Sequence, residues 1–139
     1  MNVREFLSRP SELEREIGRK RFRIESLRRL AERVTPSLQE VRVRSSPDPA
    51  RMQAFLAEIA DEEQEIVRLE EERLRALTET ALAVTRLPDG RLSRLLELRY
   101  LEGLGWQEIA LRLDYCASTV FRMHKRALEL LPLPPAYRE

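Results

Sequence analysis

The chain has one cysteine, Cys116, and one histidine, His124, the two residue types that most often supply a nucleophile, a base or a metal ligand. One cysteine excludes an internal disulfide and a multi-cysteine zinc site, and one histidine leaves too few ligands for a histidine-based metal centre. A nucleophilic Cys116 would need a base beside it, but His124 lies 8 residues further on, about two helical turns away. Since the sequence also shows no paired acids and no phosphate-binding loop, we expect no enzymatic activity and no cofactor.

A short cluster of cations offers a different chemistry, the binding of an anionic polymer. Arg122, Lys125 and Arg126 lie within 5 residues of one another, and Glu129 is the one acid close to them. An arginine can donate two hydrogen bonds to guanine in the major groove of DNA, whereas cations further along a helix more often contact phosphate. Arg122 is therefore the predicted base reader, and Lys125 and Arg126 are predicted phosphate contacts. His124 is interpreted as partly protonated, making a phosphate or polar surface contact.

The spacing of apolar residues around this cluster is typical of a helix-turn-helix, in which two short helices cross at a wide angle. Such a crossing needs apolar anchors and a small residue where the backbones approach. These are Ile109 and Leu113 on the first helix, Ala110 as the small residue, Tyr115 at the turn, and Val120 and Met123 on the second helix. The turn needs a residue that tolerates positive φ, and Asp114 stands there in place of the commoner glycine. Trp106 is expected to be a core anchor, whereas Phe121 falls on the exposed side, where it can touch a thymine methyl group, pack on the N-terminal half or contact a partner.

The same part of the chain resembles a known family. The resemblance is carried by Leu96-Glu97-Leu98-Arg99-Tyr100-Leu101, Trp106-Gln107-Glu108-Ile109-Ala110, Tyr115-Cys116 and Val120-Phe121-Arg122-Met123-His124-Lys125-Arg126-Ala127-Leu128. These segments are similar to the C-terminal helix-turn-helix of sigma factors, the sigma-70 region 4 type. A closer likeness is to small phage-encoded regulators of the ArpU or sigma-like type. Such a resemblance, over about residues 90–131, implies sequence-specific binding of double-stranded DNA in transcription, in the cytoplasm.

Transferred residue by residue, the resemblance implies that Ala117, Ser118 and Arg122 touch base edges. Cys116 falls where the family usually has serine or threonine as the N-cap of the recognition helix, and cysteine is a weak hydrogen-bond acceptor. Ser118 and Thr119, near the start of that helix, can reach bases or phosphate. The complete set of predicted DNA contacts is Ala117, Ser118, Thr119, Phe121, Arg122, Lys125 and Arg126, on a recognition helix of about residues 117–130.

Two longer helices must precede this module. Ser11 and Glu14 form a capping-box pattern, so the first helix is predicted over about residues 11–34. Its heptad seam consists of Leu13, Ile17, Lys20, Ile24, Leu27, Ala31 and Val34. Within this seam, the long side chain of Lys20 can either reach solvent or pair with an acid on a partner helix.

The second helix follows an irregular connection over residues 35–48, which contains helix-breaking prolines. Asp48 as an N-cap and Pro49 at the first helical position begin a helix that is expected to run over residues 49–87. Its apolar stripe is Met52, Leu56, Ile59, Ile66, Leu74, Leu77, Ala81 and Val84, with Glu63 and Glu70 on the same stripe.

Opposite charges on these two segments indicate that they pair. Residues 1–44 carry 12 basic and 7 acidic side chains, a balance of +5, and residues 45–90 carry 5 basic and 11 acidic ones, a balance of −6. An antiparallel hairpin is the simplest arrangement of two adjacent amphipathic helices of opposite sign. The basic run at residues 19–23 is a solvated helix face that can also pair with the acidic helix or touch phosphate, and the acidic helix is the nearer partner.

Composition agrees with an all-α protein. Charged residues make up 35% of the 139 residues and only 4 are glycine, a composition typical of long helices with solvated faces. The expected modules are a coiled-coil-like helical hairpin over residues 1–88, a helix-turn-helix over residues 89–131 and a tail over residues 132–139. No apolar run is long enough to span a membrane, so we expect a cytoplasmic protein without a membrane partner.

These observations predict a DNA-binding transcription regulator, of phage or prophage origin, whose hairpin forms a homodimer or contacts RNA polymerase. A structural or packaging adaptor of the small-terminase type, in which the hairpin builds a ring, is the alternative from another functional class. A helix-turn-helix used only for protein contact is a third hypothesis.

Overall fold

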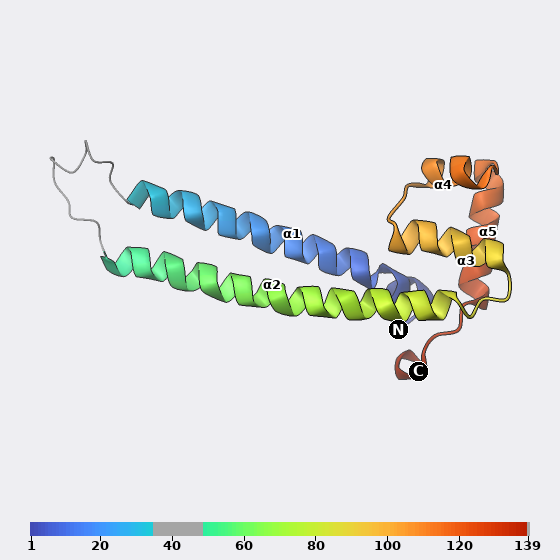
Figure 1. Cartoon of the computed structure of the whole chain (residues 1–139), viewed down its shortest axis with the longest axis horizontal. Helices are drawn as coiled ribbons and strands as arrows, with labels where there is room; N and C mark the ends of the chain where they lie inside the picture. The colour runs from blue at the N-terminus through green and yellow to red at the C-terminus, as the bar shows by residue number, and fades with distance from the viewer. Residues whose placement is uncertain (35–48, 139) are drawn as a thin grey trace. The chain divides into compact units, whose positions relative to one another are not determined.

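The structure is a computed structural model that describes residues 1–34 and 49–138. The long helices are α1 (Val3–Val34) and α2 (Pro49–Val84). The shorter elements are α3 (Gly90–Leu96), the π-helical turn η1 (Glu97–Leu101), α4 (Trp106–Leu113), α5 (Ala117–Leu130) and the 3-10 turn η2 (Pro135–Tyr137), as Figure 1 shows. The described residues contain helices and turns and no strand, so the predicted all-α class is confirmed. The predicted connection over residues 35–48 lies outside the described residues.

The chain forms two compact units. One unit comprises Leu13–Glu71, and the other joins Met1–Glu12 to Glu72–Glu139. The boundaries of these units differ from those of the expected modules, which are residues 1–88 and 89–131. The reason is that the first residues of α1 and the last turns of α2 pack together with the C-terminal helices.

The N-terminus of α1 differs from the prediction. The helix begins at Val3 and not near residue 11, and its capping box is formed by Asn2 and Glu5, not by Ser11 and Glu14. The Glu5 amide donates to Asn2 Oδ1 over 2.8 Å, and the Asn2 amide donates to Glu5 Oε2 over 3.0 Å. Pro10 lies inside the helix and has no N–H for the carbonyl of Phe6, four residues before it. The Arg9 guanidinium donates to that carbonyl over 3.3 Å, which compensates for the missing hydrogen bond.

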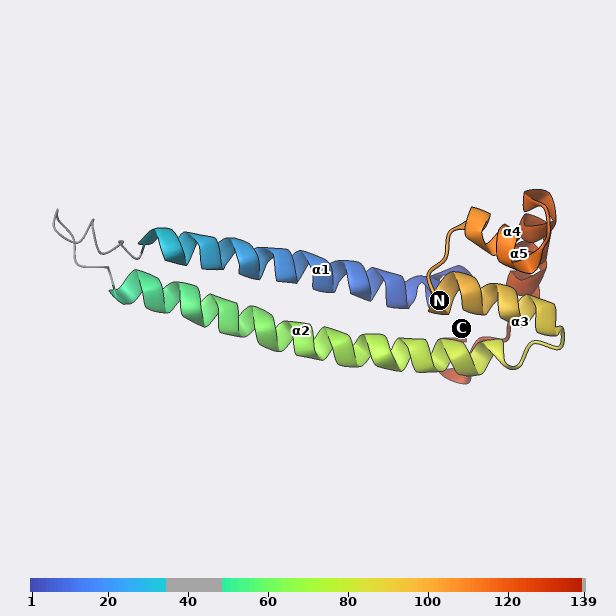
Figure 2. The same cartoon turned by 45° about the horizontal axis from the view of Figure 1, so that its top comes forward.

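Within the unit Leu13–Glu71, α1 and α2 lie side by side (Figure 2) and run antiparallel. Arg21 pairs with Glu70, and Arg28, seven residues later, pairs with Glu63, seven residues earlier. The buried contacts between the helices are made by Ile24, Leu27 and Ile59, with Phe55 and Ile66 packed against them. The predicted hairpin is therefore present in this unit.

The contact face of α2 agrees only in part with the stripe predicted for it, because Met52, Ile59 and Ile66 of that stripe lie on the face. Leu56 and Leu74 of that stripe are 56% and 66% exposed, and Glu63 and Glu70 are also exposed. The side chains on the inner face, buried or half-buried, alternate at three and four residues and are Met52, Phe55, Ile59, Glu62, Ile66 and Leu69. On α1, Lys20 does pair with an acid, since its Nζ lies 3.2 Å from Glu62 Oε2.

The other unit has a core built from both ends of the chain. Its buried members are Phe6, Leu7, Ala83, Val84, Leu87, Leu92, Leu96, Ala127 and Leu131. Arg9 stacks on the ring of Tyr137, with its guanidinium carbon 4.6 Å from the ring centre, and also pairs with Glu79. Tyr137 in turn donates a 2.6 Å hydrogen bond to Glu79. Residues near the C-terminus are thus anchored on α1 and α2.

Candidate nucleic-acid interface

The helix-turn-helix is organised around a small core between α3, η1, α4 and α5. Leu95, Leu98, Ile109 and Val120 are its fully buried members. The side chains packed against them are Leu104, Trp106, Ala110, Leu113, Tyr115 and Met123. All six predicted anchors therefore lie in one cluster, and so does Trp106. A core of this kind fixes the direction in which the exposed face of α5 points.

The turn between α4 and α5 has the predicted backbone conformation. Asp114 has φ 58° and ψ 43°, in the left-handed region, and is the one described residue other than glycine with positive φ. Its amide and that of Tyr115 donate to carbonyls in the last turn of α4, which terminates the helix. Aspartate tolerates this conformation better than most residues because its short polar side chain can bond locally.

At the start of α5, Cys116 occupies the N-cap position without a side-chain capping hydrogen bond, in agreement with the weak cap expected of cysteine. Its Sγ lies 3.3 Å from Ser118 Oγ and 3.2 Å from Thr119 Oγ1. Hydrogen bonds from these two hydroxyls lower the pKa of the Cys116 thiol to about 6.

The predicted DNA contacts lie on the outer face of α5. Six of the seven are exposed, and Thr119 is half-buried. Arg122 has one short polar neighbour, Thr119 Oγ1 at 3.4 Å, whereas Arg126 lies 3.5 Å from Glu129. No carboxylate in the described part of the chain pairs with Arg122 or Lys125. Two cations on this face are consequently available to an external anion.

His124 contradicts the sequence interpretation, which placed it on the surface and partly protonated. Its side chain is buried, and its Nε2 shares a 2.7 Å hydrogen bond with the hydroxyl of Tyr100. Its ring also packs against that of Trp106 in a T-shaped contact, with ring centres 4.6 Å apart. Burial, together with the positive charges of Arg4 and Arg99, lowers the pKa of His124 to about 4. His124 is therefore a neutral packing residue at neutral pH, and it contributes no charge to the outer face.

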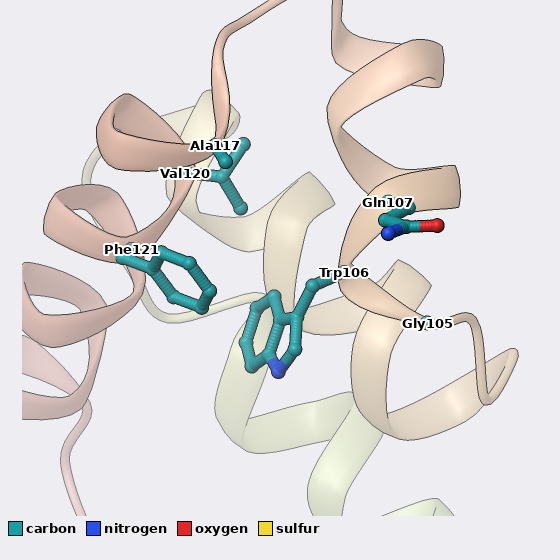
Figure 3. Close-up of a pocket in the computed structure, with 6 residues that line it drawn as sticks. All are labelled: Gly105, Trp106, Gln107, Ala117, Val120 and Phe121. Atoms are coloured by element: carbon teal, nitrogen blue, oxygen red, sulfur yellow. The ribbon is translucent and has the colours of Figure 1, made fainter.

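An open pocket lies beside the first turns of α4 and α5. Its lining residues are Gly105, Trp106, Gln107, Ala117, Val120 and Phe121, and its volume is about 490 Å³. Figure 3 shows the ring of Phe121 on α5 directed towards that of Trp106 on α4, and the ring centres are 5.4 Å apart. Phe121 remains 51% exposed, so it presents apolar area next to Ala117.

Comparison with known proteins agrees with this geometry. Residues 50–130 match the family model described as ECF sigma factor, and this match covers more than half of the chain. The chain belongs to the ECF sigma factor family. No curated protein and no solved structure matches the chain significantly.

Membership of the ECF sigma factor family gives the chain a sigma-factor-like, DNA-binding role in the regulation of transcription. This family is regulatory and not enzymatic. The match confirms the resemblance to sigma factors at residues 90–131 and extends it through α2 to residue 50. In the described residues no helix is long and apolar enough to cross a membrane.

The sequence alone does not predict one cation that lies beside α5. Arg91, in the first turn of α3, lines a surface groove together with Thr119, Arg122 and Arg126 of α5. Asp89, the N-cap of α3, lies 3.4 Å from its guanidinium and accepts a hydrogen bond from its amide. The position of Arg91 depends on the packing of α3 against α5, and no local pattern in the sequence predicts that contact.

Proposed function

We propose that the chain is a sequence-specific regulator of transcription that places α5 in the major groove of double-stranded DNA. The observation that carries the proposal is the outer face of α5, where Arg122 and Lys125 pair with no carboxylate of residues 1–34 and 49–138. The opposite face of the helix is fixed in a buried core. A rigid helix that presents cations and small polar residues is what major-groove reading requires. Such a regulator acts in the cytoplasm, and its resemblance to ArpU-like proteins supports a phage or prophage origin.

The seven outer residues divide into two roles. Ala117, Ser118, Phe121 and Arg122 read base edges, because they lie towards the N-terminal end of the helix, which enters the groove first. Phe121 contacts a thymine methyl group, a role supported by its exposure and by its packing on Trp106. The remaining residues, Thr119, Lys125 and Arg126, contact phosphates together with Arg91.

The hairpin formed by α1 and α2 supplies a second contact, either with another copy of the chain or with RNA polymerase. Leu56 and Val67, both more than half exposed on α2, give it apolar surface for such a contact. Light scattering on the purified protein separates these partners, because a dimer supports the first and a monomer the second. A ring of many copies would instead indicate the packaging adaptor.

The decisive experiment is selection of bound duplexes from a random pool, followed by titration of variants on the selected and on random DNA. Arg122→Ala should cost about 1 to 3 kcal/mol on the selected site and relax the preference at one base pair, since a bidentate base contact is lost. Lys125→Ala should weaken binding to both duplexes equally and reduce the salt slope by about one unit. Equal losses on both duplexes for Arg122→Ala would make Arg122 a phosphate contact, and selection of no sequence at all would refute the proposal.

A further inference from the structure

The first residues of α1 lie against the recognition helix. Phe6 and Leu7 are fully buried in the same core as Ala127 of α5, and Val3 and Leu128 pack against that core. The reciprocal hydrogen bonds between Asn2 and Glu5 cap the helix at this point. The N-terminal turn is therefore held in a fixed place on the compact unit that contains α5.

This packing brings Arg4 next to Lys125. The two residues line one surface pocket together with Asn2, Val3, Leu128 and Glu129. Arg4 is exposed, and its charge contributes to the lowered pKa of His124, which places the guanidinium near the side of α5. The acid in this pocket, Glu129, lies 3.5 Å from Arg126, and no carboxylate among the described residues pairs with Arg4.

The Arg4 pocket and the Arg91 groove lie along different sides of the outer face of α5. Arg126 lines the groove that contains Arg91, and Lys125 lines the pocket that contains Arg4. Positions 125 and 126 are neighbours in sequence, and one residue corresponds to about 100° around a helix. When a helix lies in the major groove, the phosphates of the two strands flank it on its two sides.

We propose that Arg4 contacts a DNA phosphate, so that the N-terminal turn of α1 holds one strand while Arg91 holds the other. The inference rests on the proposed function, since it requires α5 to lie in the major groove. It adds to the interface a residue that lies outside the family match at residues 50–130. Its physical basis is a cation that pairs with no carboxylate of the described residues, on a packed helical turn at the edge of the surface that faces DNA.

The first experiment compares Arg4→Gln with Arg19→Gln in the full chain. Arg19 is a matched control because it is exposed on α1, in the compact unit without α5, and its loss changes the net charge equally. Arg4→Gln should weaken binding to selected and random duplexes by about five- to tenfold and reduce the salt slope by about one unit. Arg19→Gln should change neither quantity, and both melting temperatures should match the parent. Arg4→Lys should restore most of the affinity, because phosphate accepts a point charge.

The second experiment locates the contact. Single uncharged methylphosphonate linkages are placed in turn along both strands of the selected duplex, and each duplex is titrated with the parent, Arg4→Gln and Arg91→Gln. One linkage should abolish the difference between the parent and Arg4→Gln, and it should lie on the opposite strand from the linkage that does so for Arg91→Gln.

The outcomes separate this inference from the proposed function. Equal losses of DNA affinity in Arg4→Gln and Arg19→Gln would overturn the Arg4 contact, because they would show that only the total charge of the protein matters. Unchanged binding by Arg4→Gln, with binding lost in Arg122→Ala, would overturn the Arg4 contact alone. A parent protein that binds no duplex would overturn both.

Discussion

The hairpin in the unit Leu13–Glu71 and the outer face of α5 are both rich in cations, but they use them differently. On the hairpin, cations of α1 face carboxylates of α2, in the pairs Lys20 with Glu62, Arg21 with Glu70, Arg23 with Glu58 and Arg28 with Glu63. On α5, Arg122 and Lys125 meet no carboxylate in the described part of the chain. Local charge density alone therefore does not identify an anion-binding surface, because a nearby carboxylate weakens the attraction of a cation for an external anion. The basic run at residues 19–23 is largely satisfied by the acidic helix, as the charge counts predicted.

The two regions also differ in how deeply they bury apolar side chains. Leu95, Leu98, Ile109 and Val120 of the helix-turn-helix core are at most 1% exposed. The buried apolar side chains of the hairpin unit keep 2 to 8% of their surface, because a pair of helices shields its seam from two directions only, and they are Ile17, Ile24, Leu27, Ile59 and Leu69. We infer that the stability of the helix-turn-helix depends strongly on its buried core. The hairpin should tolerate substitutions at its buried positions better.

The largest difference between the regions is expected from a buried charge. Ile109→Asp should destabilise its unit by several kcal/mol and abolish DNA binding, because aspartate would be desolvated among apolar side chains. Ile24→Asp should lower the free energy of unfolding by less, since a small shift of the hairpin helices exposes the carboxylate to solvent. It should leave the intrinsic DNA affinity of α5 unchanged. Thermal unfolding and titration with the selected duplex measure both effects. A larger loss of stability in Ile24→Asp would reverse the comparison.

A second difference is the pH dependence that His124 gives to the helix-turn-helix unit. Its pKa is lowered to about 4 in the folded protein from the ordinary value of 6.5, so between these pH values the unfolded chain binds the proton and the folded chain does not. The contribution to stability is complete above about pH 6.5 and is lost as the pH falls towards 4, with a slope of at most about 1.4 kcal/mol per pH unit.

Replacement of the histidine isolates this contribution. In His124→Phe, the free energy of unfolding should no longer depend on pH between pH 5 and 6.5. The loss of the hydrogen bond to Tyr100 lowers the free energy of unfolding at every pH. Carboxylates with lowered pKa, such as Glu79, act mainly below this window. Chemical denaturation at a series of pH values gives the measurement, and an unchanged slope would show that His124 is not the group responsible.

A smaller effect is expected at the polar contact in the hairpin seam. Lys20 and Glu62 are 24% and 18% exposed, so removing one partner leaves the other charge poorly solvated. A double-mutant cycle with Lys20→Met and Glu62→Leu should give a coupling of about 1 kcal/mol, and the double variant should be close to the parent in stability. DNA affinity should not change in any of these variants. The exposed pair Arg28 and Glu63 is the matched control and should show a smaller coupling.

The smallest effect is expected at the N-cap of α5. Cys116→Ser replaces a weak acceptor with a hydroxyl that can accept a hydrogen bond from an amide in the first turn. The melting temperature should rise by about 1 to 3 °C. Cys116→Ala is the control, because alanine is close to serine in size but has no hydroxyl that could accept a hydrogen bond. A serine variant that melts no higher than the alanine variant would show that the hydroxyl does not cap the helix.

The sequence alone determined the helix-turn-helix, because the relevant contacts are local. Ile109, Ala110 and Val120 lie within twelve residues of one another, and the crossing that they make fixes which side of α5 faces outwards. The left-handed turn at Asp114 was predictable for the same reason, since two helices joined by so short a segment require it. The weak cap at Cys116 followed from its side-chain chemistry.

Tertiary structure decided the features that depend on distant partners. Two sets of apolar positions on α2 have helical spacing, and only the approach of α1 selects Phe55 and Leu69 over Leu56. The start of α1 at Val3 also depends on distant residues. Burial of Phe6 in the core stabilises the helical turn that precedes Pro10. The sequence alone groups His124 with Arg122, Lys125 and Arg126 and predicts a surface contact for it. Its burial against Tyr100, 24 residues away in sequence, arises only when η1 packs against α5 and provides the hydrogen bond that a buried imidazole needs.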